Sequence, residues 1–214
     1  MVFVLFTQSF DNQKSDKIKN AEKKIFCTEK LKRGNNATLT GRALLGYILK
    51  KHYGIESFSY TYSKNGKPFL SNSDIYFSIS HSGDMVACSI SEKETGCDIE
   101  KINEFNPKIP KRFFTDKEAD IIDGHESKER VFTRLWTLKE SILKKKGIGI
   151  TGGLDTYCFA DNTFSESFTA YGCSFRCHSF CEYELSVCYE EKYADEEVII
   201  VDIEDFINYI DDLN

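Results

Sequence analysis

The stretch Gly96-Cys97-Asp98-Ile99-Glu100 sets two carboxylates at strand spacing, directly after a run that is typical of a β-hairpin. Successive side chains of a strand point to opposite faces, so Asp98 and Glu100 share one face with their Cα atoms about 6.6 Å apart. Two oxygen ligands this close suit a hard cation such as Mg²⁺, which binds one or two carboxylates together with water and phosphate. The stretch therefore predicts a metal and a phosphate-bearing substrate, with a solvated acidic face as the alternative.

The hairpin that leads into this stretch shows a clear alternation. Ile75 to Ser80 predicts a strand, Ser82-Gly83-Asp84 predicts a turn, and Met85 to Ser91 predicts the antiparallel partner. The hairpin leaves Ser80 and His81 at a strand end. The connection that follows the hairpin is short, so the acidic pair is expected to lie close to the hairpin.

Length, composition and charge are those of an ordinary globular protein. The 214 residues suffice for one large domain or for two of about 100 residues each. The net charge of −6 argues against a general nucleic-acid binder, which needs a basic field. Any anionic ligand must therefore meet a local basic patch. The densest basic region of the first half runs from Asp11 to Arg33 and includes Lys23, Lys24, Lys30 and Lys32. It is either a solvated face or such a patch.

The opening run Met1 to Phe6 is apolar but too short to span a bilayer, and it lacks the basic flank and cleavage site of a signal peptide. We therefore expect a first β-strand and no membrane segment. Without an export signal, the eight cysteines are expected to be reduced thiols in a cytoplasmic protein. Cys173-x-x-x-Cys177-His178-x-x-Cys181 allows a zinc site, although tetrahedral sites usually draw on tighter cysteine pairs.

Two long helices are predicted, one in each half of the chain. An apolar stripe of helical period predicts the first helix over Thr40 to Tyr53. The second is predicted from Glu129 to Lys146, with core-facing residues at helical spacing: Val131, Leu135, Leu138 and Ile142. Trp136, Glu140 and Lys144 are four residues apart and share a different face of this helix.

The best boundary between two halves lies at Asn103 to Pro110, which carries two of the three prolines. This boundary predicts an N-terminal subdomain over 1–102 and a C-terminal subdomain over 103–214. Just beyond it, Thr115-x-x-Glu118 is a capping box that predicts the start of a helix. Phe206-x-x-Tyr209-Ile210 predicts a short closing helix.

Four motifs stand in this order along the chain: Ile79-Ser80-His81-Ser82-Gly83, Gly96-Cys97-Asp98-Ile99-Glu100, Arg112-Phe113-Phe114-Thr115 and Trp136-Thr137-Leu138-Lys139-Glu140-Ser141. Together they resemble the signature of the 4′-phosphopantetheinyl transferases, and the length resembles the larger, surfactin-synthetase-activating type. The similarity runs from about Ser57 to Gly149. It implies an α+β fold that is a pseudo-dimer of two similar subdomains, each pairing a small antiparallel sheet with a long helix, and an active site at their interface.

The resemblance also implies an activity. Enzymes of this family transfer phosphopantetheine from coenzyme A to a serine hydroxyl of an apo acyl carrier or peptidyl carrier protein and release 3′,5′-ADP. Mg²⁺ held by Asp98, Glu100 and Glu140 would bridge the pyrophosphate and stabilise the departing phosphate. By the same similarity Glu140, directly or through a metal-bound water, is the favoured base. No nucleic acid or membrane partner is expected, and the protein is expected to be a monomer.

Further site residues come from the same resemblance. His81 and Lys144 are expected to hold phosphate oxygens and to complete the catalytic set with Glu140. Ser80 and Lys67, the latter within Gly66-Lys67-Pro68, are expected to bind coenzyme A. Arg42 and a lysine near Lys30 to Arg33 are expected to meet the 3′-phosphate.

Two other functions remain open at this stage. One is a binding module of the same fold that holds coenzyme A or a carrier domain without turnover. The other is a metal-dependent phosphohydrolase, which would share the carboxylates but would have to expose its pyrophosphate to water. The sequence does not decide whether the carrier belongs to fatty-acid, polyketide or nonribosomal-peptide synthesis.

Overall fold

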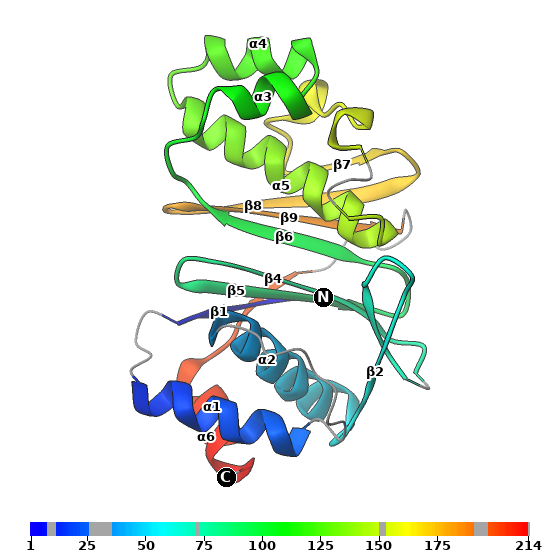
Figure 1. Cartoon of the computed structure of the whole chain (residues 1–214), viewed down its shortest axis with the longest axis vertical. Coiled ribbons are helices and arrows are strands. Elements are labelled where there is room, and N and C mark those ends of the chain that lie inside the picture. Colours follow the sequence, from blue (N-terminus) through cyan, green and yellow to red (C-terminus); the bar gives the residue numbers. More distant parts are fainter. Residues whose placement is uncertain (8–11, 26–35, 72, 150–152, 191–196, 214) are drawn as a thin grey trace.

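The computed structural model describes residues 1–7, 12–25, 36–71, 73–149, 153–190 and 197–213. Within these residues, two four-stranded sheets lie face to face, and helices cover the outer side of each sheet (Figure 1). The apolar layer between the sheets includes Val2, Val4, Met85, Cys97, Ile99, Leu185 and Val187. This arrangement of small, mainly antiparallel sheets with helices confirms the predicted α+β fold class.

The first sheet has the strand order β10-β1-β5-β4, with β1 parallel to β10 and all other neighbours antiparallel. Its strands are β1 (Val2–Phe6), β4 (Tyr76–Ser82), β5 (Met85–Ser91) and β10 (Val198–Ile200). Three helices lie on its outer side: α1 (Asn12–Ile25), α2 (Asn36–Tyr53) and α6 (Ile203–Leu213) (Figure 1). A separate small hairpin is formed by β2 (Tyr60–Tyr62) and β3 (Pro68–Leu70).

The second sheet has the order β6-β9-β8-β7 and is antiparallel throughout. Its strands are β6 (Gly96–Lys101), β7 (Ser167–Ala170), β8 (Cys173–Phe180) and β9 (Tyr183–Glu190). The helices on its outer side are α3 (Lys108–Phe113), α4 (Asp116–Gly124) and α5 (Lys128–Lys146) (Figure 1). Two short 3₁₀ helices follow, η2 (Leu154–Thr156) and η3 (Ala160–Asn162).

The chain exchanges elements between the two layers. Strand β6 ends at Lys101, before the predicted boundary, yet it pairs with β9 of the second sheet. Strand β10 and helix α6 return to the first layer, where Phe206 and Ile210 are buried in its core. The division into 1–102 and 103–214 therefore does not coincide with the two sheets, and it stays a proposal.

The predicted helices are present, with small differences at their starts. The apolar stripe of α5 is buried, since Leu135, Leu138 and Ile142 are 0% exposed. Helix α2 begins at Asn36, one turn before the predicted start, and the Thr40 hydroxyl bonds within the helix. The capping box at Thr115 starts α4 as expected, and the predicted closing helix is α6.

Close approach of β6 to α5 depends on Gly96. A Cβ atom at this position would overlap the carbonyl oxygen of Ser141 and the backbone nitrogen of Lys145. Only glycine allows a strand backbone to lie this near a helix backbone. The contact places the two carboxylates that follow Gly96 directly beneath α5.

The cysteines of the candidate zinc motif do not come together. Cys173 and Cys177 are buried in β8, whereas Cys181 is exposed beyond the end of that strand. In the described part of the chain, no three His, Cys, Asp or Glu side chains form a ready metal cluster. None of the helices built from the described residues is long and apolar enough to cross a membrane.

Candidate functional site

A cavity of about 280 Å³ lies where β4, β6 and α5 meet. Residues far apart in the sequence reach it because β4 and β6 are neighbours across the two sheets and α5 packs on β6. Six of the eight predicted site residues line this cavity together with Ile79 and Trp136: Ser80, His81, Asp98, Glu100, Glu140 and Lys144. The fold therefore brings these six residues to one cavity, and their roles there stay a prediction.

Asp98 is buried and is held by two neighbours through the same oxygen. Lys144 Nζ lies 2.6 Å from Asp98 Oδ1, and the Ser80 hydroxyl donates to that oxygen over 2.8 Å. Burial, the largest single cause, lowers the pKa of Lys144, but the charges of Asp98 and Glu140 and the hydrogen bond to Asp98 together contribute to a net upward shift. Lys144 therefore stays protonated and neutralises part of the acidic cavity.

Ser80 and Ser82 of β4 each bond to a carboxylate of β6, and the sequence reasoning, which did name Ser80 as a site residue, missed this pairing. Ser80 and Ser82 share one face of β4, as Asp98 and Glu100 share one face of β6, so each serine meets one carboxylate. The Ser82 hydroxyl donates to Glu100 Oε2 over 2.7 Å and accepts from the Lys101 backbone N–H. The matching two-residue spacing in both stretches was the available signal.

Glu140 on α5 completes the acidic group. It is 7% exposed, and its Oε1 has no hydrogen-bond partner among the described residues. Burial, and then the charge of Asp98, raises its pKa to about 7. Burial and Asp98 also raise the pKa of Glu100.

These carboxylates fit a divalent cation. Asp98 Oδ2 and Glu140 Oε1 are both buried, and neither has a hydrogen-bond partner in the part of the chain that the structure describes, which is costly unless another group satisfies them. Burial, and then the like charge of Asp98, raises the pKa of Glu140, and a bound cation would offset both effects. The three side chains line one cavity, although within the described residues they do not form a preformed cluster.

His81 and Trp136 form the more open side of the cavity. Burial, and then the nearby charge of Lys144, lowers the pKa of His81, so its ring is neutral near pH 7. The ring nitrogen Nε2 lies 3.5 Å from the hydroxyl of Thr38 on α2. Trp136 belongs to an aromatic row that continues away from the cavity through Phe132 to Phe105.

A second cavity of about 280 Å³ adjoins the first, and Ile79 and Lys144 line both. Its walls combine the predicted Lys67 with apolar residues that the sequence reasoning did not single out: Pro68, Phe77 and Leu143. Lys67 Nζ donates to the carbonyl oxygens of Lys145 over 2.6 Å and Thr95 over 3.3 Å. Lys67 therefore sits beside the carboxylate cavity and not within it.

The predicted 3′-phosphate contacts are only partly located. Arg42 is half-buried on α2 and lines neither cavity. The basic stretch Lys30 to Arg33 lies outside the described residues, and so do the side chains of Lys23 and Lys24. The role of this basic region stays a prediction.

Comparison with known proteins gives one family. The family model described as "4′-phosphopantetheinyl transferase superfamily" matches residues 94–198. The chain is 34% identical over 144 residues to a 4′-phosphopantetheinyl transferase of Bacillus subtilis, covering 64% of each chain. It is 38% identical over 118 residues to 4′-phosphopantetheinyl transferase gsp of Aneurinibacillus migulanus, covering 51% of this chain and 49% of that protein. It is 32% identical over 145 residues to 4′-phosphopantetheinyl transferase AcpT of Escherichia coli O157:H7, covering 63% and 68%. The matches thus span about half to two thirds of the length of these curated relatives.

Proposed function

The chain belongs to the 4′-phosphopantetheinyl transferase superfamily, and from this premise we propose that it transfers the phosphopantetheine group of coenzyme A to a serine of an apo acyl or peptidyl carrier protein. The observation that carries the proposal is the junction of two cavities at Lys144 and Ile79. One cavity holds three carboxylates and the other has apolar walls. A molecule with a pyrophosphate joined to a nucleoside matches this pair.

The carboxylate cavity is the proposed place of the pyrophosphate. Asp98, Glu100 and Glu140 would hold Mg²⁺, which neutralises phosphate charge and favours departure of the leaving group when it is bound. Lys144 reaches this cavity from α5, and His81 reaches it from β4. We propose that both donate to phosphate oxygens, because an ammonium and an imidazole N–H are donors that suit anionic oxygen.

The second cavity is the proposed place of the nucleoside. Phe77, Leu143 and Pro68 offer the apolar surface that a base requires, and Lys67 lies at the same wall. Lys67 also donates hydrogen bonds to a carbonyl oxygen at the C-terminal end of α5 and to one in the β5–β6 connection. It would therefore hold the cavity wall in place as well as face the ligand. Arg42 and the basic stretch before α2 remain our proposal for the 3′-phosphate.

Glu140 is the proposed general base. The serine oxygen of the carrier forms a bond to the phosphorus atom that bears the pantetheine arm, and the bond from that phosphorus to the 3′,5′-ADP oxygen breaks. Glu140 would take the serine proton through the carboxylate oxygen that the cation leaves free. Lys144 and His81 stay as donors to the charge that moves onto 3′,5′-ADP.

Two further parts of the proposal concern the setting. All seven described cysteines are free, which supports a reducing compartment such as the cytoplasm. We also propose that the protein acts as a monomer, because both sheets and all residues of the cavity come from one chain.

An intact-mass measurement tests the proposal. The protein is incubated with coenzyme A, Mg²⁺ and an apo carrier protein, and the carrier is expected to gain the mass of one phosphopantetheine group. A carrier of unchanged mass would contradict the proposal. Coenzyme A that stays intact would then indicate the binding module, and cleaved coenzyme A would indicate the phosphohydrolase.

A further inference from the structure

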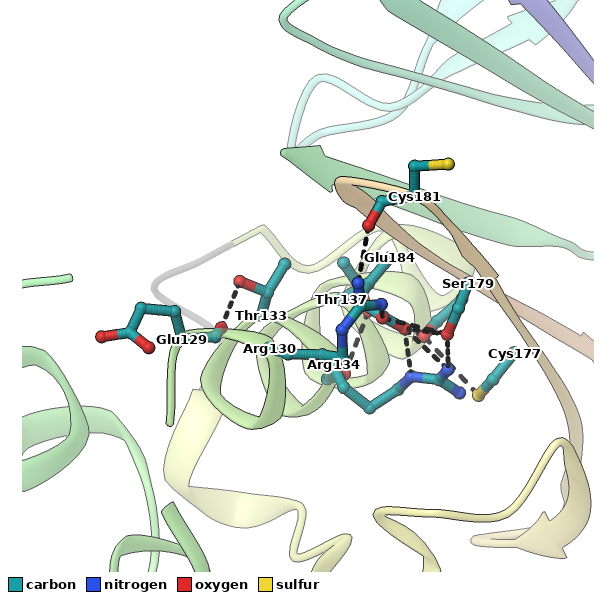
Figure 2. Close-up of polar contacts among 10 residues, drawn as sticks. Glu129, Arg130, Thr133, Arg134, Thr137, Cys177, Ser179, Cys181 and Glu184 are labelled. Atoms are coloured by element: carbon teal, nitrogen blue, oxygen red, sulfur yellow. Dashed lines mark hydrogen bonds and ion pairs between the residues drawn. The ribbon is translucent and has the colours of Figure 1, made fainter. Parts of the chain in front are cut away.

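An ion-pair cluster centred on the buried Glu184 lies under the N-terminal half of α5 (Figure 2). Glu184 on β9 is fully buried and is held by two arginines of α5. Arg130 Nη1 lies 2.5 Å from Glu184 Oε1, and Arg134 Nε lies 2.6 Å from Glu184 Oε2. The Ser179 hydroxyl donates to the same carboxylate, and Arg134 Nη2 donates to Ser179 Oγ over 2.9 Å.

The cluster also reaches the turn that joins β8 to β9. Arg130 Nη2 donates to the carbonyl oxygen of Cys181 over 2.6 Å (Figure 2). Arg134 is 12% exposed, whereas Arg130 is 40% exposed. These bonds join helix α5 to both strands of the β8–β9 hairpin. They therefore fix the distance of α5 from the sheet and its rotation about its own axis.

Strand register links this cluster to the candidate site. Glu184 lies directly opposite Glu100 in the pairing of β9 with β6, and Ser186 lies opposite Asp98. Residues directly opposite one another share a face of the sheet, so all four side chains face α5. Thr137 on α5 completes the contact, with its hydroxyl 2.8 Å from Ser186 Oγ. Each proposed metal ligand on β6 thus has, beside it on β9, a residue that is bonded to α5.

The cluster is better explained by geometry than by stability. A buried ion pair is weak evidence for stability, because desolvation of the charges offsets much of their attraction. A planar guanidinium that contacts one carboxylate and one hydroxyl fixes both the position and the orientation of the helix that carries it. Glu140 lies six residues after Arg134 on the same rigid helix, so the orientation of α5 sets the separation of Glu140 from β6.

We propose that Arg130, Arg134 and Glu184 are positioning residues that hold α5 where Glu140, Asp98 and Glu100 can share one divalent cation. The inference rests on the proposed function in one respect: the transferase activity is what gives the bound cation its catalytic role. Outer residues that orient metal ligands typically contribute about 10- to 100-fold in metal affinity or activity. We expect the lower end of this range, since the cluster acts through α5 and does not touch the cation.

Two single variants separate positioning from a simple charge effect. Glu184→Gln removes a negative charge near the cation, and Arg134→Gln removes a positive one. A field effect alone would weaken Mg²⁺ binding in the first variant and strengthen it in the second. Loss of positioning weakens binding in both. The control is Lys128→Gln, which removes a cation from the first turn of the same helix, where Lys128 pairs only loosely with Asp123 at 3.6 Å.

The primary readout is Mg²⁺ binding by the substrate-free protein, followed as the rise in Tm with Mg²⁺ concentration. We expect Glu184→Gln and Arg134→Gln each to weaken Mg²⁺ binding by about tenfold and Lys128→Gln to match the wild type. In transfer assays kcat should fall in the same two variants while KM for coenzyme A changes little. Urea unfolding checks that each variant is folded. If Glu184→Gln does not fold, Arg134→Lys takes its place in the Mg²⁺ titration. This variant keeps the positive charge but loses the planar guanidinium, so positioning predicts weaker Mg²⁺ binding and a charge effect predicts no change.

The proposal is overturned if the variants lose stability but bind Mg²⁺ like the wild type, or if the two shifts have opposite signs. A wild type that binds Mg²⁺ but transfers nothing would refute the transferase and leave the positioning role supported by the binding data. A wild type that transfers normally, with variants that do the same, would refute positioning alone. A wild type without any Mg²⁺ response would refute positioning, and the intact-mass measurement would then decide separately whether the protein is a transferase.

Discussion

Lys144 and Asp98 form a short ion pair, 2.6 Å between Nζ and Oδ1, that joins α5 to β6 across the candidate site. The Asp98 side chain is 3% exposed and the Lys144 side chain is 30% exposed, so the pair stands at the inner end of an open cavity. Asp98 Oδ2 is left without a partner and faces no other cation among the described residues. The pair therefore anchors the helix while leaving one carboxylate oxygen for a ligand.

Asp98→Asn tests this double role. The substitution keeps the shape of the side chain but leaves the Lys144 ammonium without its carboxylate, so we expect a loss of about 1–3 kcal/mol in the free energy of unfolding. Transfer of phosphopantetheine should be lost, because an amide is a poor ligand for Mg²⁺. Urea unfolding and single-turnover transfer measure the two effects. Normal transfer in this variant would remove Asp98 from the site.

Glu140→Gln tests the proposed base. The amide keeps shape and hydrogen bonding but accepts no proton, so transfer should fall by about 10²-fold or more, the scale of general-base catalysis. Binding of coenzyme A with Mg²⁺, measured by calorimetry, should weaken only modestly. If binding and transfer fall by the same factor, Glu140 is a ligand only and another group is the base.

The raised pKa of Glu140 predicts a pH dependence of stability without metal. The folded-state pKa is about 7, against 4.5 for an ordinary solvated glutamate, so between these pH values the folded state binds more protons than the unfolded state. Stability from this residue is therefore fully present below pH 4.5 and is lost as pH rises through 7. Glu140→Gln should flatten this decline in urea unfolding measured with a chelator present. The exposed Glu126→Gln is the control, and an equally flat curve for the control would contradict the assignment.

Lys139 lies within the motif that carries the family resemblance, but its side chain turns away from the cavity. It is fully buried, pairs with Glu118 over 2.8 Å and donates to the carbonyl oxygens of Leu154 and Tyr157. Lys139→Met leaves the buried Glu118 carboxylate without its cation, which should cost about 3–5 kcal/mol of stability.

A matched control uses the exposed ion pair of Lys117 with Asp161, at 2.8 Å. Lys117→Met should leave the free energy of unfolding almost unchanged, because solvent screens an exposed ion pair. Adding Glu118→Gln to Lys139→Met should recover part of the lost stability. Equal urea midpoints for the Lys117 and Lys139 variants would refute the structural role of Lys139.

Local patterns predicted much of the fold because periodicity and caps act within a few residues. The β4–β5 hairpin, the apolar stripe of α5 and the capping box at Thr115 all follow from such patterns. The return of β10 to pair with β1 did not, because pairing of strands distant in sequence depends on which edges the rest of the fold leaves open.

The residues of the candidate site also divide into those that a local pattern predicted and those that it did not. Asp98 and Glu100 were accessible from strand spacing, whereas Glu140 joined them only through the family resemblance. The Glu184 cluster was not foreseen, because its partners become neighbours only through the register of β6 with β9 and the packing of α5. Buried charged partners of this kind have no local sequence signal.

The central claim is that coenzyme A is consumed by transfer to a serine and not by hydrolysis. The most direct test follows both products of one turnover: the intact mass of an apo carrier protein and the 3′,5′-ADP released, with Mg²⁺ present. A carrier whose target serine is replaced by alanine serves as the control. The account predicts one 3′,5′-ADP for each phosphopantetheine gained by the serine carrier, and neither product with the alanine carrier. Release of 3′,5′-ADP at the same rate with both carriers, without any gain in carrier mass, would contradict it.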